Sequence, residues 1–500
     1  MHNKIVENLI SKRNLNITHN VPETSIANID KVVQKLKEVV SLGKSVHIYG
    51  DYDVDGIFSV AQLYLCLKSL GSKVVYTLPN RYLTGYGLQD TKIFTEDVIV
   101  LVDTGITAIE QIKQLTSCGK EVIIIDHHLP KDELPKTEYI VNPKCDFDGY
   151  PFKERCAAGL LNIICKQLKT PVSEHTLDIF AMISTIADAV PLIQDNRDIV
   201  KRGLLALQNQ GYLAIDILYS LLGKKIIDEE TIAYYLVPCL NAPGRLGAPD
   251  IILEFLLSDN IAHCTKLALN IIDQNKQRKA LVKKYIACLK DSKNYADLAC
   301  IYNPSIPVGI LGIIASRMSE QLKKPVLVTN GYRGSCRSVE GINIVKVLQD
   351  LSENLEVYGG HATAAGFTVK KDCISQLIQD CNNYKITTIH APSVGYDAVL
   401  NISDINMSLL QALEIMKPFG PGNRQPVFKT ENVAIESKKI CGKNKDTLQI
   451  RLNNSDIQLI MFNCTEVPSD TINITYTIGL NIYNNKQYIQ LNLQTIERRN

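Results

Sequence analysis

The sequence predicts a multidomain α/β protein in which a parallel sheet comes first and a small β-barrel comes last. Its 500 residues exceed the ~100–200 of an ordinary domain, so two to four domains are expected. Over residues 1–130, continuous apolar runs of strand length alternate with helical patterns, which indicates a parallel sheet covered by helices on both faces. Beyond Pro392, short runs of alternating polarity replace that pattern and favour a barrel.

The composition excludes several classes of protein. Hydrophobic residues make up 45% and charged residues 21%, which excludes a disordered or collagen-like chain. No apolar run approaches the ~20 residues of a membrane span, and the N-terminus lacks the apolar core of a secretory signal, so no membrane association is expected. The 14 cysteines include no C-x-x-C pair, which favours reduced thiols in the cytoplasm. Because the net charge is only +2, a nucleic-acid partner would require a local basic surface.

Four strands and two helices are predicted in the first α/β part. Each strand is a short apolar run, as the strands of a buried parallel sheet are. The helix after the first strand places apolar side chains at three- and four-residue spacing. The predicted strands are Val46–Gly50, Lys73–Leu78, Val98–Val102 and Glu121–Ile125, and the predicted helices are Ile57–Leu70 and Ala108–Cys118.

A helical region follows, from Ala157 to about Leu289, and it ends in a long connector. The stretch Cys264–Asp291 contains no Gly or Pro. As one helix it would span ~40 Å, which suits a rigid connection between domains. Its basic side chains form either a solvated helix face or one wall of a nucleic-acid groove. They are Lys276, Arg278, Lys279, Lys283 and Lys284.

The last two parts are a smaller α/β unit and the barrel. Strand–helix alternation resumes over Ala296–His390, and short strands follow from Val427 to Ile496, with a hairpin signal at Asn484-Asn485-Lys486. We therefore expect domain boundaries near residues 215, 295 and 390. The expected domains are 1–215, including an extra N-terminal helix within 1–40, then 216–294, 295–390 and 391–500.

Three predicted strands of the first sheet are each followed at once by acidic or imidazole side chains. The first ends in Asp51-Tyr52-Asp53-Val54-Asp55, the next in Asp103 and the last in Asp126-His127-His128. The carboxyl ends of parallel strands meet at one edge, where open α/β sheets bind ligands. One such motif alone could be a turn or a helix cap, as Asp55 could be, but three at equivalent strand ends indicate a site.

This acidic edge predicts a metal centre. Carboxylates packed so closely repel one another and have raised pKa values, and divalent cations relieve that repulsion. A mixture of Asp oxygens and His nitrogens suits Mn²⁺ or Mg²⁺ better than a thiolate-binding metal. Two such ions that share a carboxylate can activate water and clamp a phosphoryl oxygen. Hydrolysis of a phosphoester is therefore the predicted reaction class.

These motifs, above all Asp126-His127-His128, resemble those of the DHH phosphoesterases. Ser184-Thr185-Ile186-Ala187-Asp188 is similar to the family's fourth motif. Within the family, the chain resembles the RecJ branch, the 5′→3′ exonucleases of single-stranded DNA, over about residues 40–500. The resemblance implies a parallel-sheet DHH domain, a helical connector, a smaller α/β DHH-associated domain and a C-terminal OB-type barrel. Further segments that carry it are Pro79–Arg81, Gly85–Leu88, Asn241–Gly247, Gly309–Arg317, Gly359–His361, Phe419–Asn423 and Pro426–Phe428.

The resemblance implies which residues hold the two ions. Asp53 and Asp103 would hold one ion. Asp103 would bridge to the second, whose other ligands would be Asp55, His127 and Asp188.

The resemblance also implies roles for the residues around these ligands. Asp51 would act as a ligand directly or through water. His128 would contact the scissile phosphate, and Asp126 would orient the histidines. Tyr49 stands where many family members have a histidine, so the first ion would have one protein ligand fewer.

A pocket for a terminal 5′-phosphate is the next implication of the resemblance. A planar guanidinium meets phosphate oxygens two at a time, although each arginine could instead form a salt bridge. Gly359 and Gly360 would let the strand approach the backbone, with His361 nearby, unless they simply form a tight turn. The residues expected around the phosphate are Arg81, Arg245, Ser335 and Arg337, the last of them in a loop-like segment.

Three functions remain open from the sequence. They are a RecJ-type exonuclease that yields 5′-mononucleotides in DNA repair and recombination, a DHH phosphodiesterase of short oligonucleotides, and a non-catalytic DNA-binding scaffold. The C-terminal segment and the intact aspartates and histidines favour the first. The expected partners are single-stranded DNA with a 5′ end and a helicase or single-strand-binding protein that delivers it, and a monomer is expected. In the barrel, Tyr483 and Tyr488 would either stack on bases or pack internally.

Overall fold

The computed structural model describes most of the chain, which forms two compact units. The larger unit contains residues 21–190 and 198–392, and the smaller contains residues 1–20, 191–197 and 393–500. Among the described residues, no helix is long and apolar enough to cross a membrane. The described residues are 2–15, 26–83, 87–145, 147, 149–289, 295–386, 395–442, 445–453, 455–464, 470–483 and 486–498.

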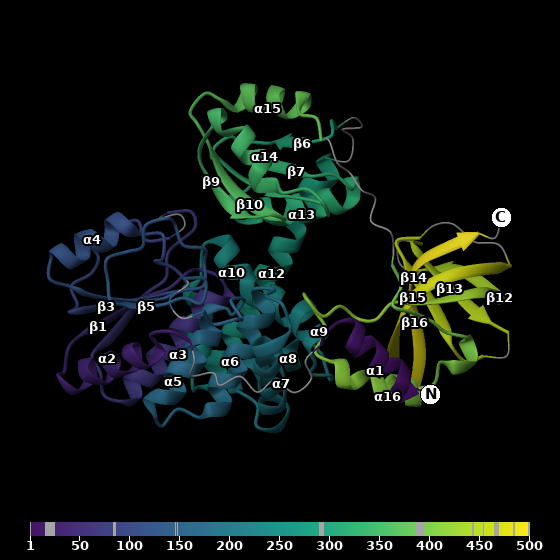
Figure 1. Ribbon diagram of the computed structural model, residues 1–500, viewed down its shortest axis with the longest axis horizontal. Helices are drawn as coiled ribbons and strands as arrows, with labels where there is room; N and C mark the ends of the chain where they lie inside the picture. The colour runs from purple at the N-terminus through teal and green to yellow at the C-terminus, as the bar shows by residue number, and fades with distance from the viewer. Residues whose placement is uncertain are drawn as a thin grey trace. The chain divides into compact units, whose positions relative to one another are not determined.

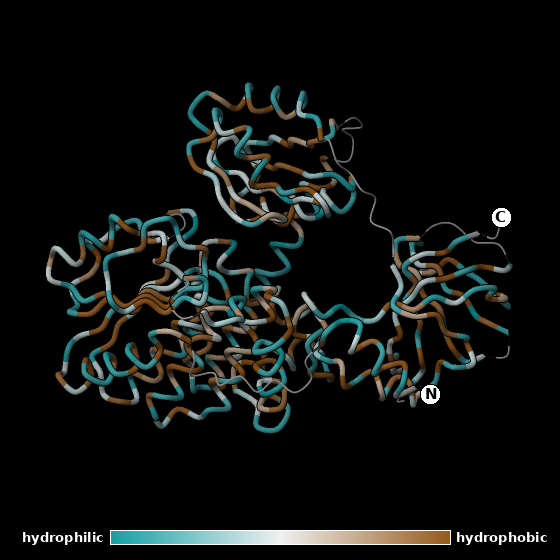
Figure 2. The backbone as a smooth tube through the Cα atoms, viewed as in Figure 1, coloured by the Kyte–Doolittle hydropathy of each residue, from teal (hydrophilic) through white to brown (hydrophobic). Residues whose placement is uncertain are grey.

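The larger unit begins with a five-stranded parallel sheet in the order β2-β1-β3-β4-β5, which confirms the fold predicted for the first α/β part. Its central strands form the brown, hydrophobic band of Figure 2. Helix α4 lies on one face of the sheet, and α2, α3 and α5 lie on the other (Figure 1). The strand order reverses between β1 and β3, and open α/β sheets bind ligands at such a switch point. The strands are β1 (Val46–Tyr49), β2 (Val74–Thr77), β3 (Val98–Val102), β4 (Glu121–Ile125) and β5 (Tyr139–Val141), and the helices are α2 (Ile29–Ser41), α3 (Val54–Ser69), α4 (Ile109–Ser117), α5 (Ala157–Leu168) and α6 (Glu174–Ala187).

A helical region follows, and its last helix connects the two α/β parts of the larger unit. Helix α12 (Ile261–Leu289) has 29 residues and spans ~44 Å. It packs against α8, α10 and α11, and Val282, Tyr285 and Leu289 near its end join the core of the second α/β part. The predicted rigid connector is therefore confirmed. The other helices are α7 (Gln194–Asn209), α8 (Leu213–Leu221), α9 (Glu229–Thr231), the π-helix η2 (Ile232–Leu236), α10 (Val237–Leu246) and α11 (Asp250–Leu257).

The four lysines on the basic face of α12 are exposed, whereas Arg278 is half-buried. This exposure fits both a solvated helix face and the wall of a nucleic-acid groove. Arg278 instead donates two hydrogen bonds to Asn275 Oδ1, at 3.1 and 2.8 Å.

The second α/β part is a mixed sheet in the order β6-β7-β8-β10-β9, in which only β6 and β7 are parallel. The strands are β6 (Ala299–Tyr302), β7 (Val326–Thr329), β8 (Arg333–Arg337), β9 (Leu355–His361) and β10 (Ala364–Val369). The helices are η3 (Val308–Ile310), α13 (Leu311–Leu322), α14 (Ile344–Asp350), η4 (Ser352–Asn354) and α15 (Ile374–Asn383).

One expectation about this sheet is wrong, and one alternative is excluded. The segment that holds Arg337 is strand β8 and not a loop, because β7 and β10 hydrogen-bond to it on both sides despite its Gly and Ser residues. Gly359 and Gly360 lie within strand β9 and do not form a tight turn. Gly360 has a φ of 147°, and a Cβ there would lie 2.5 Å from Ala364 O, so the close pairing with β10 requires glycine.

The smaller unit is built on a β-barrel of the predicted OB type. Strands β12 to β16 form a sheet that the pairing of β12 with β15 closes on itself. The hairpin residues Asn484 and Asn485 and the side chain of Tyr483 lie outside the described residues, and Tyr488 is half-buried. The elements are β11 (Ala398–Val399), η5 (Ile402–Asp404), α16 (Met407–Leu413), η6 (Glu414–Met416), β12 (Phe428–Cys441), β13 (Thr447–Leu452), β14 (Gln458–Phe462), β15 (Thr471–Tyr483) and β16 (Lys486–Arg498).

The N-terminal helix α1 (His2–Lys12) belongs to this smaller unit and not to the first α/β part, with which it was grouped. Val6 and Leu9 are buried in the barrel core, and α1 packs on α16. Just beyond the helix, Arg13 Nη2 lies 2.8 Å from Asp397 Oδ2. The sequence did not indicate that α1 packs on the barrel, because the contacts join residues almost 400 positions apart.

Candidate metal centre

Strand β1 delivers its three aspartates through a tight turn into helix α3. Asp53 is the N-cap of α3, and its Oδ1 accepts a hydrogen bond from Gly56 N at 3.2 Å. A Cβ at Gly56 would lie 2.5–2.7 Å from backbone atoms of Asp51, so this turn requires glycine. Asp55 therefore does not cap α3. Its carboxylate accepts hydrogen bonds of 2.8 and 3.0 Å from two backbone N–H groups at the start of α5.

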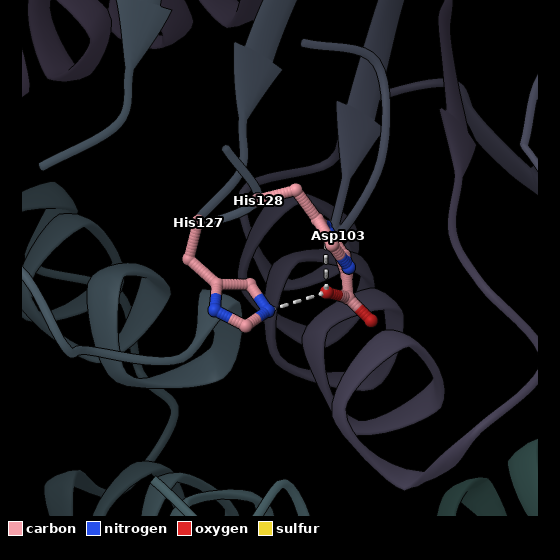
Figure 3. Close-up of side chains that lie close together, drawn as sticks. All are labelled: Asp103, His127 and His128. Carbon is pink, nitrogen blue, oxygen red and sulfur yellow. Dashed lines mark ion pairs between the residues drawn. The ribbon is translucent and has the colours of Figure 1, made fainter. Parts of the chain in front are cut away.

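Strand β3 delivers Asp103 in a left-handed backbone conformation, with φ at 56°. Such a conformation costs about 1 kcal/mol for most residues, and Asp tolerates it better than most. The hydrogen bond from Asp103 N to Ile125 O, at 3.0 Å, holds it beside the end of β4. The side chain is 3% exposed, and its Oδ1 lies 3.2 Å from His127 Nε2 (Figure 3).

Strand β4 delivers Asp126 and the two histidines. Asp126 Oδ1 accepts hydrogen bonds from His127 N (2.7 Å), His128 N (3.1 Å) and, through the ring, His128 Nδ1 (2.7 Å). Its Oδ2 accepts one from Ile106 N at 2.9 Å. Both oxygens of Asp126 are thus engaged within the protein, which suits a residue that orients the histidines.

The side chains assigned to metal binding lie together at this edge of the sheet. His127 Nε2 is 3.7 Å from Asp55 Oδ2 and 3.7 Å from Asp188 Oδ2, and Asp188 follows directly after α6. In each of three groups, one ligand atom per residue lies within 4.8 Å of the others. The groups are Asp103, His127 and His128; Asp55, His127 and Asp188; and Asp51, Asp53 and Asp103.

The crowded carboxylates have raised pKa values. Burial, followed by the charge of Asp53, raises the pKa of Asp51 to about 7. Burial, with the charge of Asp53 adding to it, raises the pKa of Asp55 to about 6. Burial and the neighbouring aspartates raise the pKa values of Asp103 and Asp188 well above their usual range. Keeping these carboxylates ionised therefore costs free energy, and a bound cation would remove that cost.

The donor atoms fit divalent cations of the Mn²⁺ or Mg²⁺ type. Asp51 Oδ1, Asp103 Oδ1 and His127 Nδ1 are buried and have no hydrogen-bond partner among the described residues. Burial also lowers the pKa of His127 to about 3, so its ring is neutral and can serve as a ligand. Buried polar atoms without partners beside a set of carboxylate oxygens indicate an ion-binding site.

Tyr49 does not contribute a ligand atom to this cluster. Its side chain packs in the core between the sheet and α4, and its hydroxyl donates to Gly87 O at 3.1 Å.

Four arginines form a second cluster, which we call the arginine cluster: Arg81, Arg245, Arg278 and Arg337. Burial, then the charges of Arg81, Arg278 and Arg337, lowers the pKa of Arg245 to about 10. Among the described residues, none of the four forms an ion pair with a carboxylate. Unpaired guanidinium groups that repel one another would bind an anion strongly.

Each predicted member of the arginine cluster is held by local contacts. The Arg81 guanidinium lies 4.1 Å from the centre of the Tyr52 ring, and Arg245 Nη1 donates to Gly309 O at 3.3 Å. Arg337 Nη1 donates to Cys336 O (2.9 Å) and to Ser335 Oγ (3.4 Å). The alternative that these three arginines form salt bridges with carboxylates therefore does not hold among the described residues.

Strand β9 carries the predicted residues Gly359, Gly360 and His361. Burial lowers the pKa of His361, and the charges of Lys144 and His128 lower it further. A Cβ added at Gly359 would meet no atom within 4 Å, so its backbone is open to a ligand.

Sequence reasoning did not single out Asn142, whose Nδ2 donates to His128 O, or Lys144, whose N donates to Asn142 Oδ1, and it gave Arg278 no specific role. The first two follow β5, a strand of only three residues that was not predicted. The apolar triplet Tyr139–Val141 in front of Asn142-Pro143 is the signal that could have revealed a fourth strand end at this edge. Arg278 was treated only as part of a basic helix face.

Comparisons with known proteins place three domains in the chain. The DHH family N-terminal domain matches residues 45–189, the DHHA1 domain matches residues 295–385, and the RecJ OB domain matches residues 396–495. The single-stranded-DNA-specific exonuclease RecJ of Bacillus subtilis is 32% identical in an alignment 493 positions long that covers 92% of this chain and 62% of that protein. The Haemophilus influenzae protein of the same name is 27% identical over 94% of this chain and 90% of its own length.

Solved structures give the same fold. RecJ from Thermus thermophilus in complex with Mn²⁺ has a TM-score of 0.87 at 23% identity and covers 99% of this chain and 76% of its own. A structure of exonuclease RecJ bound to manganese has a TM-score of 0.64 at 28% identity and covers 73% of this chain and 95% of its own.

Proposed function

Because this chain belongs to the RecJ family of DHH phosphoesterases, we propose that it is a metal-dependent exonuclease. It degrades single-stranded DNA from a 5′ end to 5′-mononucleotides, in DNA repair and recombination. The observation that carries this proposal is the convergence of five aspartates and two histidines at one sheet edge, beside an unpaired arginine cluster. An OB-type barrel can bind extended single strands, which favours long substrates over dinucleotides.

We propose that two Mn²⁺ or Mg²⁺ ions bind at the acidic edge. Asp53 and Asp103 hold the first, and Asp51 completes that site. Asp103 also holds the second, together with Asp55, His127 and Asp188. When bound, the ions activate the attacking water and stabilise charge on the phosphoryl oxygens.

His128 supplies a positive charge to the scissile phosphate. Although burial opposes it, the hydrogen bond and charge of Asp126 raise the pKa of His128 to about 9, so the ring is protonated at neutral pH. Because Nδ1 donates to Asp126, we assign the contact with a phosphate oxygen to Nε2–H. The side chain is 34% exposed and can therefore reach a substrate.

The proposed substrate is a single strand and not a duplex, because a duplex is much wider than a single strand. With Mn²⁺ and no helicase, a long single strand should be degraded from its 5′ end at least ~100-fold faster than a blunt duplex. Time courses with strands labelled at either end, resolved by length, would measure both polarity and products. Comparable degradation of blunt duplex, or release from the 3′ end, would contradict the proposal. A preference for dinucleotides would favour the short-oligonucleotide phosphodiesterase, and binding without cleavage would favour the scaffold.

Arg337 should bind the terminal 5′-phosphate. We expect Arg337→Ala to lower kcat/KM on 5′-phosphorylated strands about tenfold to hundredfold, because a charged hydrogen bond contributes ~1.5–3 kcal/mol. A 5′-hydroxyl strand should lose much less. Arg333→Ala is a matched control on the same strand, since Arg333 Nη1 donates to Thr368 Oγ1 at 2.8 Å. Equal losses on the two kinds of strand would assign Arg337 to internal phosphates or to the fold.

The proposal also covers the location of the protein, its partners and the residues that contact the strand. The protein acts as a cytoplasmic monomer, and a helicase or single-strand-binding protein delivers the 5′-ended strand. Arg81, Arg245 and Ser335 share the terminal phosphate with Arg337, and Gly359, Gly360 and His361 line the path of the strand.

A further inference from the structure

Lys144 is a mostly buried cation beside the metal centre, and the proposed mechanism gives it no role. It lies in the turn after β5, which ends at the same sheet edge as the strands that carry the aspartates. Its side chain is 11% exposed, and its ion-pair partner among the described residues is Glu154, 3.7 Å away and half exposed. An ion pair this long with a solvated carboxylate is weak, so the ammonium group can still bind another anion.

Asn142 fixes the position of the turn that carries Lys144. Its side chain is buried, and its Nδ2 donates to His128 O at 3.0 Å. Its Oδ1 accepts a hydrogen bond from Lys144 N at 2.9 Å. One buried side chain thus ties the backbone of Lys144 to that of His128, the residue proposed to contact the scissile phosphate.

Sheet topology places the turn of Lys144 at one end of the metal centre. In the order β2-β1-β3-β4-β5, strand β5 is an edge strand, and it pairs in parallel with β4. The turn that carries Lys144 therefore lies beside the end of β4, which carries the two histidines.

Arg81 of the arginine cluster lies at the opposite end of this row of strand ends. It follows β2, the other edge strand of the sheet, and its guanidinium lies 4.1 Å from the centre of the Tyr52 ring. The ends of β1, β3 and β4, which carry the aspartates and histidines, lie between Arg81 and Lys144.

The geometry points to Lys144 as a binding residue for the internucleotide phosphate that follows the scissile phosphate toward the 3′ end. This inference rests on the proposed function. With the 5′-phosphate in the arginine cluster and the scissile phosphate at the metal centre, the next phosphate lies on the Lys144 side. A substrate must contain three nucleotides to offer that phosphate, so Lys144 sets a dependence of the rate on strand length.

The first experiment compares substrates of different length. We expect Lys144→Met to lower kcat/KM about tenfold on 5′-phosphorylated trinucleotides and longer strands, because one charged phosphate contact is lost. On a 5′-phosphorylated dinucleotide the loss should be less than about twofold, and Lys144→Arg should restore most of the rate. Lys31→Met is the matched control, since Lys31 forms an exposed ion pair with Glu138 at 3.0 Å. An equal loss on the dinucleotide, or no loss on any length, would overturn the inference.

The second experiment needs no turnover. Binding of a fluorescent single strand is measured without divalent cations at several salt concentrations. The slope of log Kobs against log salt concentration should be smaller in magnitude by about 0.7 in Lys144→Met, which is the value for one phosphate contact on a single strand. Lys31→Met should keep the wild-type slope. An unchanged slope in Lys144→Met would overturn the assignment. If the wild-type protein cleaved no strand at all, the proposed function would fail, while the salt dependence would still test Lys144.

Discussion

Replacing Asp103 with asparagine should reduce exonuclease activity about a thousandfold and leave the protein folded. Asp103 belongs to two of the three groups of candidate ligands, so the loss of its charge weakens both ion sites. Asn has nearly the same shape and also tolerates the φ of 56°. Initial rates with Mn²⁺ on a 5′-labelled strand would measure the effect, with circular dichroism to check folding. A variant that kept a tenth of the wild-type rate would show that Asp103 does not bridge two ions.

The same variant should stabilise the protein when no metal is bound. Folding raises the pKa values of Asp51 and Asp55 from their usual 3.8 to about 7 and about 6, and it raises that of Asp103 strongly. A raised carboxyl pKa means that the native state binds more protons than the unfolded state, so stability falls as the pH rises through this window. Metal-free wild-type protein should therefore lose stability between pH 4 and about pH 7. Asp103→Asn should lose less, and a large drop in its stability would identify a structural aspartate.

Replacing Asp126 with alanine should cost both activity and stability. Three backbone N–H groups and the His128 ring donate to this carboxylate, and all would lose their acceptor. Removal of one partner from a buried charged pair costs about 3–5 kcal/mol, and the loss of a residue that orients a site lowers activity about 100-fold. Urea unfolding and single-strand degradation would measure the two effects.

A separate readout tests the role of Asp126 in orienting His128. NMR titration should show the His128 pKa falling from about 9, because the hydrogen bond and charge of Asp126 are the largest contributions that oppose burial. Asp97→Ala is a matched control, since Asp97 is an exposed aspartate that accepts hydrogen bonds from Ser45. An unchanged His128 pKa in Asp126→Ala would contradict the orienting role.

Much of the candidate site could be predicted because its residues are adjacent to strands that are obvious in the sequence. The apolar runs Val98–Val102 and Glu121–Ile125 have the same bounds as β3 and β4, and the parallel pairing of these strands sets Asp103 beside the two histidines. The structure brings every residue of the predicted metal set into one cluster. The same reasoning failed at β5, because three residues carry too little periodicity to be recognised as a strand.

The sequence by itself determined the α/β class, the acidic edge and the rigid connector, because each rests on a local pattern of polarity or spacing. Tertiary structure decided the rest. It made a strand of Arg333–Arg337, placed α1 on the barrel, and chose Asp53 over Asp55 as the cap of α3. It also brought the charge of Arg278 to bear on Arg245 and tied the turn of Lys144 to His128 through Asn142. These outcomes depend on contacts between residues far apart in the chain, whose hydrogen bonds and charges outweigh local conformational preference.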